Sequence, residues 1–282
     1  RWKLKFALFF LLLLGTPFLL LILSVSTLFF GQYFLNQGYL NTSIWLVGNS
    51  VTLSNFTKDY SDSLVKVPFL GLGYEKISKA SLFLGKAAEI GLRGGDVKKT
   101  FVELTGKVLN QDDYDLETFS EEISLELNSI YVDLGFLQVE LQSSSDFTKE
   151  LVKKSLGDRD IKSLRENILN LEYLFKQTPL FLGSNEPKTF LLLFQDSSVA
   201  RPTGGLIQEF SLVTFSGGKL IDLQVYSSDY ADKNIQGFVD SPSPLKSHFG
   251  KDAWKLKDSN WDPDFPTSAT QAEWFIDKEI DV

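Results

Sequence analysis

The 282-residue chain contains no cysteine and no methionine, and it has a single histidine, His248. The lack of cysteine excludes disulfide frameworks, zinc-finger spacings and thiol nucleophiles. No nucleophile-elbow motif accompanies His248, so the sequence does not indicate a Ser-His-Asp triad. Walker loops, dinucleotide-binding fingerprints and metalloprotease helix motifs are also missing. The usual motif-bearing enzyme classes are therefore not indicated.

Charge is missing from Phe6 to Phe30, where 19 of 25 residues are apolar. At about 1.5 Å of helix rise per residue, this run is long enough to cross a hydrocarbon layer of ~30 Å. A cleavable signal peptide has an apolar core of only roughly 7 to 15 residues, although Ser24-Val25-Ser26 is an acceptable cleavage site. We predict an uncleaved transmembrane anchor over residues 6–30.

The charge distribution predicts an orientation and excludes one class of partner. Arg1, Lys3 and Lys5 precede the apolar run, which by the positive-inside rule predicts a cytoplasmic stub of residues 1–5 and an extracytoplasmic main body. The chain beyond residue 57 carries 25 Lys and Arg against 36 Asp and Glu. Such a surface repels phosphate backbones, so we expect no nucleic acid partner. The localisation predicted is a bacterial cell membrane, crossed once.

Residues 31–180 have helical periodicity and predict an extracytoplasmic helical bundle. The clearest stripe runs from Leu116 to Leu141 at spacings of three and four, and a second runs from Ile161 to Phe175. Helices with one apolar stripe must pack on each other. Boundaries are indicated at Val67-Pro68, Gly94-Gly95-Asp96 and 110–115, and also at 143–146. A structural stalk is favoured over a sensory bundle.

A different pattern follows Gly183 to Pro187 and predicts an α/β domain over residues 187–282, with a mixed sheet and helices, incomplete at Val282. Lys188 to Gln195 is a continuous apolar run typical of a strand buried on both faces. Leu206–Phe215 and Lys219–Tyr226 are strand-like and joined by Ser216-Gly217-Gly218, a hairpin signal. Thr267–Glu279 predicts a helix whose Ala272, Ile276, and either Trp274 or Phe275 face the sheet.

Two segments of this domain have the residue types of a binding site. In Asp196 to Gly205, which we expect to form a loop, paired glycines allow close approach of an anion and Arg201 has the donors to bind phosphate or carboxylate. The alternative is a turn whose arginine pairs with a structural acid such as Glu209 or Asp196. In Trp254 to Ser268, three aspartates and an asparagine suit Mg²⁺ or Ca²⁺, and two tryptophans suit a sugar ring or an apolar tail. The alternative is turn and helix-start chemistry.

Four stretches resemble a known bacterial family: Leu191–Gln195, Arg201–Gly205, Lys257–Trp261 and Pro263–Ala269. It is the membrane-anchored family termed domain of unknown function 4012, and the resemblance covers the chain from Pro187 onward. Members commonly have arginine where this chain has Lys257. Lysine keeps the charge of that position and loses the two-pronged geometry.

This family is distantly similar to the LytR-CpsA-Psr enzymes, which transfer glycopolymers from polyprenyl-pyrophosphate carriers to peptidoglycan. The similarity implies that Arg201 holds pyrophosphate and that Asp258 or Asp264 binds Mg²⁺, and we expect Arg201, Asp258 and Asp264 to be the catalytic residues. It also implies that Trp261 and Phe265 line the lipid tail or sugar. The remaining expected substrate-binding residues are Thr203, Gly204, Gly205, Lys257 and Asn260.

The competing hypothesis is a non-catalytic envelope scaffold or a module that binds glycan or a protein partner. It expects Asp258 and Asp264 to be occupied by internal hydrogen bonds, with no apolar tunnel leading to Arg201. A sensor is disfavoured because only five residues precede the apolar run. The sequence carries no signal for the oligomeric state.

Overall fold

A computed structural model describes residues 2–67, 71–142, 144, 146, 149, 150, 160–234, 237–250 and 253–279. The chain divides into two compact units. The helical unit comprises residues 1–106 and 115–178, and the C-terminal unit comprises residues 107–114 and 179–282. Each unit is described by itself.

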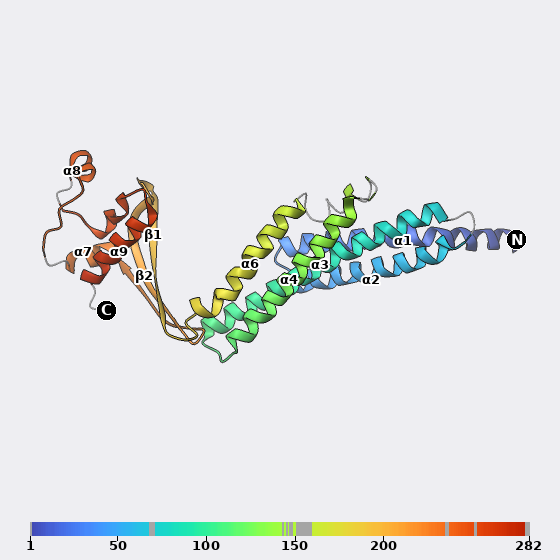
Figure 1. Cartoon of the computed structure of the whole chain (residues 1–282), viewed down its shortest axis with the longest axis horizontal. Coiled ribbons are helices and arrows are strands. Elements are labelled where there is room, and N and C mark those ends of the chain that lie inside the picture. The colour runs from blue at the N-terminus through green and yellow to red at the C-terminus, as the bar shows by residue number, and fades with distance from the viewer. Residues whose placement is uncertain are drawn as a thin grey trace. The chain divides into compact units, whose positions relative to one another are not determined.

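Long antiparallel helices build the helical unit (Figure 1). They are α1 (Trp2–Asn36), α2 (Leu40–Val65), α3 (Gly71–Asn110), α4 (Leu116–Gln142) and α6 (Ile161–Phe181). The predicted apolar helix and helical bundle are confirmed. The stretch of α1 from Leu12 to Asn36 is long and apolar enough to cross a membrane.

Small side chains let α1 and α2 approach closely. Ser24 is fully buried, and its Oγ lies 3.1 Å from Oγ of Ser50 and 2.5 Å from Oγ of Ser54. Ser50 in turn donates to the Ser24 carbonyl at 2.8 Å. At Gly31 an added Cβ would lie 2.6 Å from Cγ2 of Val47. This seam satisfies the buried hydroxyls and positions α1 along α2.

Two apolar cores stabilise the helical unit. The first joins α1, α2 and α3 through residues that include Leu28, Val47 and Leu84. The second joins α3 to α4 and α6. The stripe predicted for α4 is confirmed, because its buried apolar residues are Leu116, Ile123, Leu127, Ile130, Leu134 and Leu137. In contrast, α6 buries no residue fully.

Two features of the bundle differ from the sequence analysis. Gly94-Gly95-Asp96, predicted as a boundary, lies inside α3, where neither glycine has a positive φ and Gly95 lies against Ile44 of α2. The helix that begins as the predicted anchor continues to Asn36 and packs against α2. The boundary at residues 110–115 is confirmed as the turn between α3 and α4, and Ser143–Asp146 lies partly outside the described residues.

An antiparallel sheet of order β1-β2-β3 forms the centre of the C-terminal unit. Its strands are β1 (Lys188–Arg201), β2 (Gly204–Ser216) and β3 (Lys219–Ser227). The predicted hairpin is confirmed: Gly217 and Gly218 have φ of 56° and 81°, a conformation that glycine adopts without strain. The described strands are all antiparallel, where a mixed sheet is predicted from the sequence.

Short helices cover one face of this sheet (Figure 1). They are α7 (Ser228–Asn234), the 3₁₀ helix η1 (Leu256–Trp261) and α9 (Phe265–Glu279), whereas α8 (Ser243–Phe249) is drawn apart from the strands in Figure 1. The core between α7, η1, α9 and the sheet contains Phe210, Ala231, Leu256, Ala272, Phe275 and Ile276. Phe275 therefore faces the sheet, and Trp274 remains 44% exposed.

The first strand is longer and more exposed than the sequence predicts. Its residues 196–201, expected as a loop, continue pairing with β2 after register shifts, as in Arg201 with Gly204. Leu192 and Phe194 are each 47% exposed, so this apolar run is not buried on both faces. An antiparallel edge strand needs only one covered face. The continuous apolar run in the sequence did not distinguish such a strand from one that is buried on both faces.

Residues 107–114 belong to the C-terminal unit because they contact the β2–β3 turn. Tyr114 donates from its hydroxyl to the carbonyl of Gly218, and Gln111 donates to the carbonyl of Leu220 at 2.8 Å. Nζ of Lys219 lies 2.5 Å from Oδ1 of Asp113. These contacts hold the hairpin turn against residues 111–114.

Candidate functional site

Arg201, at the end of β1, forms a buried ion pair with Asp258 of η1. Nε and Nη2 of Arg201 both donate to Oδ1 of Asp258, at 2.9 and 2.5 Å. The two side chains are 5% and 2% exposed. The pair joins positions 57 residues apart in the sequence and is the centre of the candidate site.

The rest of the arginine is also held by its surroundings. Nη1 donates to the carbonyl of Ala200 at 2.8 Å, and the guanidinium carbon lies 6.0 Å from the centre of the Trp261 ring. Trp254 donates from its indole nitrogen to the backbone carbonyl of Asp258 at 3.0 Å. The aromatic residues of the segment thus hold the ion pair and η1 in place.

Asn260 and Thr203 connect the same two segments a second time. The Asn260 amide donates to the carbonyl of Gly205 at 2.7 Å, while the Thr203 hydroxyl donates to the carbonyl of Asn260 at 3.0 Å. Asn260 is only 1% exposed, and its Oδ1 has no hydrogen-bond partner among the described protein atoms. These bonds fix η1 against the start of β2.

The paired glycines are required by the chain's own packing. Gly204 has φ of 135°, and a Cβ there would collide with the amide of Gln195. A Cβ on Gly205 would collide with the backbone of Asp196. Residues of β1 therefore occupy the space beside the two glycines in which an anion was expected to bind.

Asp264 caps α9 and does not contact the ion pair in any hydrogen bond of the described residues. Its Oδ2 accepts from the backbone N–H of Thr267 at 3.0 Å and from the Thr267 hydroxyl at 2.7 Å. These bonds lower the pKa of the Asp264 carboxyl from its ordinary value of 3.8. Phe265, the first residue of α9, is 68% exposed. Both residues are thus part of a helix start.

Lys257 points toward α7, where its Nζ lies 3.4 Å from Oδ1 of Asp229. A residue that sequence reasoning missed, Asp232, lies in the same helix and accepts the N–H of Leu256 at 2.8 Å. Its other oxygen has no partner among the described protein atoms, and burial raises the pKa of this carboxyl above 3.8. No motif in the sequence marks Asp232.

The donors present do not fit the predicted Mg²⁺ site. Among the residues that the structure describes, no group of three or more His, Asp or Glu could hold a metal ion. Oδ1 of Asp258 receives two bonds from Arg201, and Asp264 caps a helix. Hard cations need carboxylate oxygens that face an open position. Binding of Mg²⁺ stays a prediction.

The structure thus brings together Arg201, Thr203, Gly205, Asp258, Asn260 and Trp261. Residues 185–279 match the family described as "Protein of unknown function (DUF4012)". No curated protein and no solved structure matches the chain. The family expected from the motif residues is confirmed, and the similarity to LytR-CpsA-Psr enzymes stays a prediction.

Proposed function

We propose that this chain is a membrane-attached protein of the bacterial cell envelope. Its C-terminal unit, in which residues 185–279 match the DUF4012 family, acts in this proposal as a non-catalytic scaffold or binding module. The observation that carries the proposal is the buried pair of Arg201 and Asp258. It supports a structural role for the residues that resemble a phosphate and metal site.

The pair is unsuited to substrate chemistry as it stands. An arginine that binds pyrophosphate presents its N–H groups to the ligand, whereas here Nε, Nη1 and Nη2 donate to groups of the protein. Removing one partner of a buried pair leaves an unpaired charge, which costs about 3–5 kcal/mol, while replacing both with apolar residues is often neutral. A structural pair therefore has a distinctive mutational signature.

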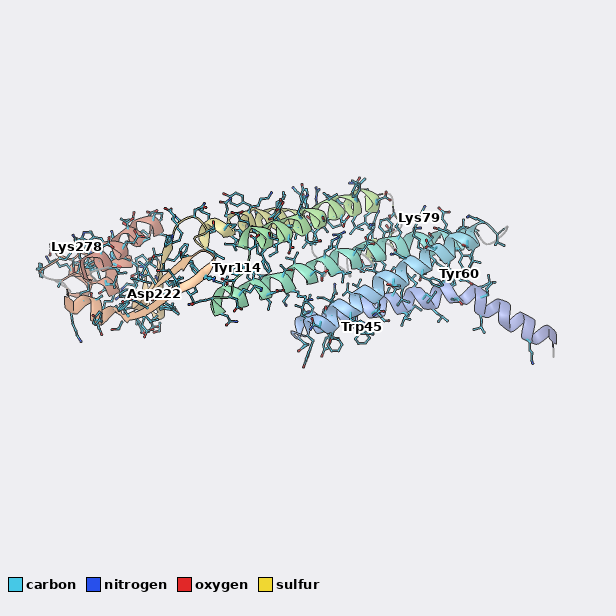
Figure 2. The ribbon with its side chains drawn as sticks, turned by 90° about the horizontal axis from the view of Figure 1, so that it is seen from below. Trp45, Tyr60, Lys79, Tyr114, Asp222 and Lys278 are labelled. Atoms are coloured by element: carbon cyan, nitrogen blue, oxygen red, sulfur yellow. The ribbon has the colours of Figure 1, made fainter. Side chains whose placement is uncertain are left out.

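The membrane part of the proposal rests on the outer face of α1. The exposed apolar residues of α1 are Leu12, Leu13, Phe18, Leu19, Ile22, Leu23, Phe29, Phe30 and Tyr33. Exposed Trp45 of α2 projects from the side opposite Lys79 of α3 (Figure 2). A large apolar face marks an interaction site, and aromatic residues favour the membrane interface. We propose that this face contacts the bilayer.

Charges beside α1 argue against a bilayer that surrounds the packed bundle. The Tyr60 hydroxyl donates to the carbonyl of Leu13, which places the neighbouring ion pair of Lys58 and Asp62 close to the start of the apolar stretch. Because α2 returns along α1, a bilayer around the packed pair would be crossed by both helices and would bring the charges of α2 to its edge. A single pass with a cytoplasmic N-terminus thus requires α1 to separate from α2. Attachment through the outer face does not.

The ion pair is tested by thermal unfolding of Arg201→Met, Asp258→Leu and the double variant. We expect each single variant to lose about 3–5 kcal/mol of unfolding free energy and the double variant to recover most of it. Lys246→Met is the control, because Lys246 and Asp240 form an exposed pair 2.5 Å apart whose loss costs only about 0–1 kcal/mol. Single variants as stable as wild type would contradict the structural role.

A binding measurement separates this proposal from the transferase. Polyprenyl pyrophosphate is titrated into the folded full chain with and without Mg²⁺, and we expect no metal-dependent binding. Binding that requires Mg²⁺ and is lost in a folded Arg201→Lys variant would overturn the non-catalytic proposal.

The second candidate is transfer of a polyprenyl-pyrophosphate-linked glycopolymer to peptidoglycan. One observation favours it: residues of two distant motifs, Arg201–Gly205 and Lys257–Trp261, meet around one arginine. For this function Asp258 must first release Arg201, since the guanidinium is otherwise neutralised. We therefore rank this proposal second.

A further inference from the structure

The helical unit contains an apolar pocket of about 250 Å³ where five helices meet. Its lining comes from α1, α2, α3, α4 and α6. The lining residues that the argument uses are Leu28, Gln32, Ser43, Gly94, Ile130 and Leu134. None of these residues belongs to the candidate site of the C-terminal unit.

The floor of the pocket is apolar and its rim is open. Leu28, Ile130 and Leu134 are each at most 3% exposed, whereas Gly94 is exposed. A Cβ added to Gly94 would have no atom within 4 Å, so this glycine leaves free space at the rim. Gln32 and Ser43 are the polar members of the lining. Water is a poor occupant of such a space because it needs two to four polar partners.

Helix α1 contributes residues both to the pocket and to the outer face. Leu28 and Gln32 line it, while Phe29 and Phe30 of the same turns are 41% and 60% exposed on the outer face. One side of α1 thus meets the pocket and the other side meets the surface that we assign to the bilayer. An acyl chain that leaves the bilayer beside α1 would exchange one apolar environment for another, at little cost in hydrophobic free energy.

We propose that this pocket binds one acyl chain of a membrane lipid. Its volume of about 250 Å³ lies below the usual range of ligand pockets, roughly 300–1,000 Å³, which suits part of a single chain and excludes a complete lipid. A hydrocarbon chain also restores the dispersion contacts that an empty apolar space forfeits. The inference rests on the proposed membrane attachment of α1.

The test is photo-crosslinking of the full chain in vesicles of phosphatidylcholine and phosphatidylglycerol, doped with phosphatidylcholine that carries a diazirine at the end of one acyl chain. Crosslinked residues are mapped by mass spectrometry. We expect crosslinks at Ile22 and Leu23, which report bilayer contact, and at Ile130 and Leu134, which are buried and reachable through the pocket.

Gly94→Leu fills the rim and is expected to abolish the crosslinks at Ile130 and Leu134 while leaving those at Ile22 and Leu23. Gly106→Leu is the matched control: it lies on the same helix, outside the pocket lining, and its Cβ also meets no atom within 4 Å. Leucine has a higher helix propensity than glycine, so both variants are expected to fold, which circular dichroism checks.

The remaining outcomes overturn the proposal in distinguishable ways. Crosslinks at Ile22 and Leu23 without any at Ile130 or Leu134 would reject the pocket and leave membrane attachment standing. Crosslinks at none of these positions would reject both. Crosslinks at Ile130 and Leu134 that persist in Gly94→Leu would show that the chain does not occupy this pocket.

Discussion

The aspartates between Trp254 and Ser268 have three different surroundings. Asp258 is buried against Arg201. Asp262 accepts the N–H of Asp264 with its side chain and the Ser268 hydroxyl with its carbonyl. Asp264 accepts two bonds from Thr267. Each carboxylate is thus used by a separate local structure, and their density in the sequence reflects a helix start beside a buried ion pair.

Asp264→Ala is expected to lower the melting temperature at neutral pH, and the difference from wild type is expected to shrink as the pH falls below 3.8. The folded pKa of Asp264 lies below its ordinary value of 3.8, so its stabilising effect is present above 3.8 and is lost as the pH falls through the folded pKa. The measurement is thermal unfolding across pH 2 to 7.

Asp277→Ala is the control for this prediction, because Asp277 is an exposed carboxylate of α9 outside the first turn. Asp277 lies in the last turn of α9, where the helix dipole does not favour a negative charge. We expect no loss of melting temperature at neutral pH in this variant. A difference for Asp264→Ala that persists unchanged at pH 2 would rule out the capping explanation.

Small residues at the contact of α1 and α2 determine how closely these helices approach. Gly31 faces Val47, whereas Gly15, also in α1, has no atom within 4 Å of an added Cβ. The two glycines therefore form a matched pair, one in the seam and one outside it. Overpacking of a close contact costs about 1–3 kcal/mol.

Gly31→Leu is accordingly expected to be less stable than Gly15→Leu by about 1–3 kcal/mol in thermal unfolding. Both variants replace glycine with leucine and so gain the same helix propensity. The difference between their stabilities therefore measures the contact between α1 and α2 and not the intrinsic stability of the helix. Equal stability of the two variants would show that α1 does not pack against α2 through Gly31.

Over the complete chain, the lack of cysteine allows the position of α1 to be measured directly. A Ser24→Cys, Ser54→Cys double variant places thiols where two Oγ atoms lie 2.5 Å apart. We expect this disulfide to form to the same extent in detergent and in vesicles, because the outer face of α1 contacts the bilayer while the seam persists.

The control is Ser26→Cys, Ser54→Cys, since Ser26 is only partly buried and its hydroxyl donates to the carbonyl of Ile22 in its own helix. This pair is expected to crosslink weakly in both conditions. Loss of the Ser24–Ser54 crosslink only in vesicles would mean that α1 separates from α2 and crosses the bilayer as a single pass.

Local patterns predicted much of the fold. The apolar run from Phe6 to Phe30, the stripe from Leu116 to Leu141 and the Gly217-Gly218 turn each depend on neighbouring residues, and each element formed. The same patterns did not reveal that residues 196–201 continue β1 or that Gly94 lies within α3. Those outcomes depend on pairing partners that are distant in the sequence.

The sequence by itself determined a long apolar helix, an amphipathic bundle, a hairpin with helices after it, and the family of residues 185–279. Only the tertiary structure decided that the partner of Arg201 is Asp258, where the sequence analysis suggested Glu209 or Asp196 as structural partners. It also decided that Phe275, and not Trp274, enters the core. The physical reason is that burial and ion pairing depend on contacts between segments that composition and spacing do not encode.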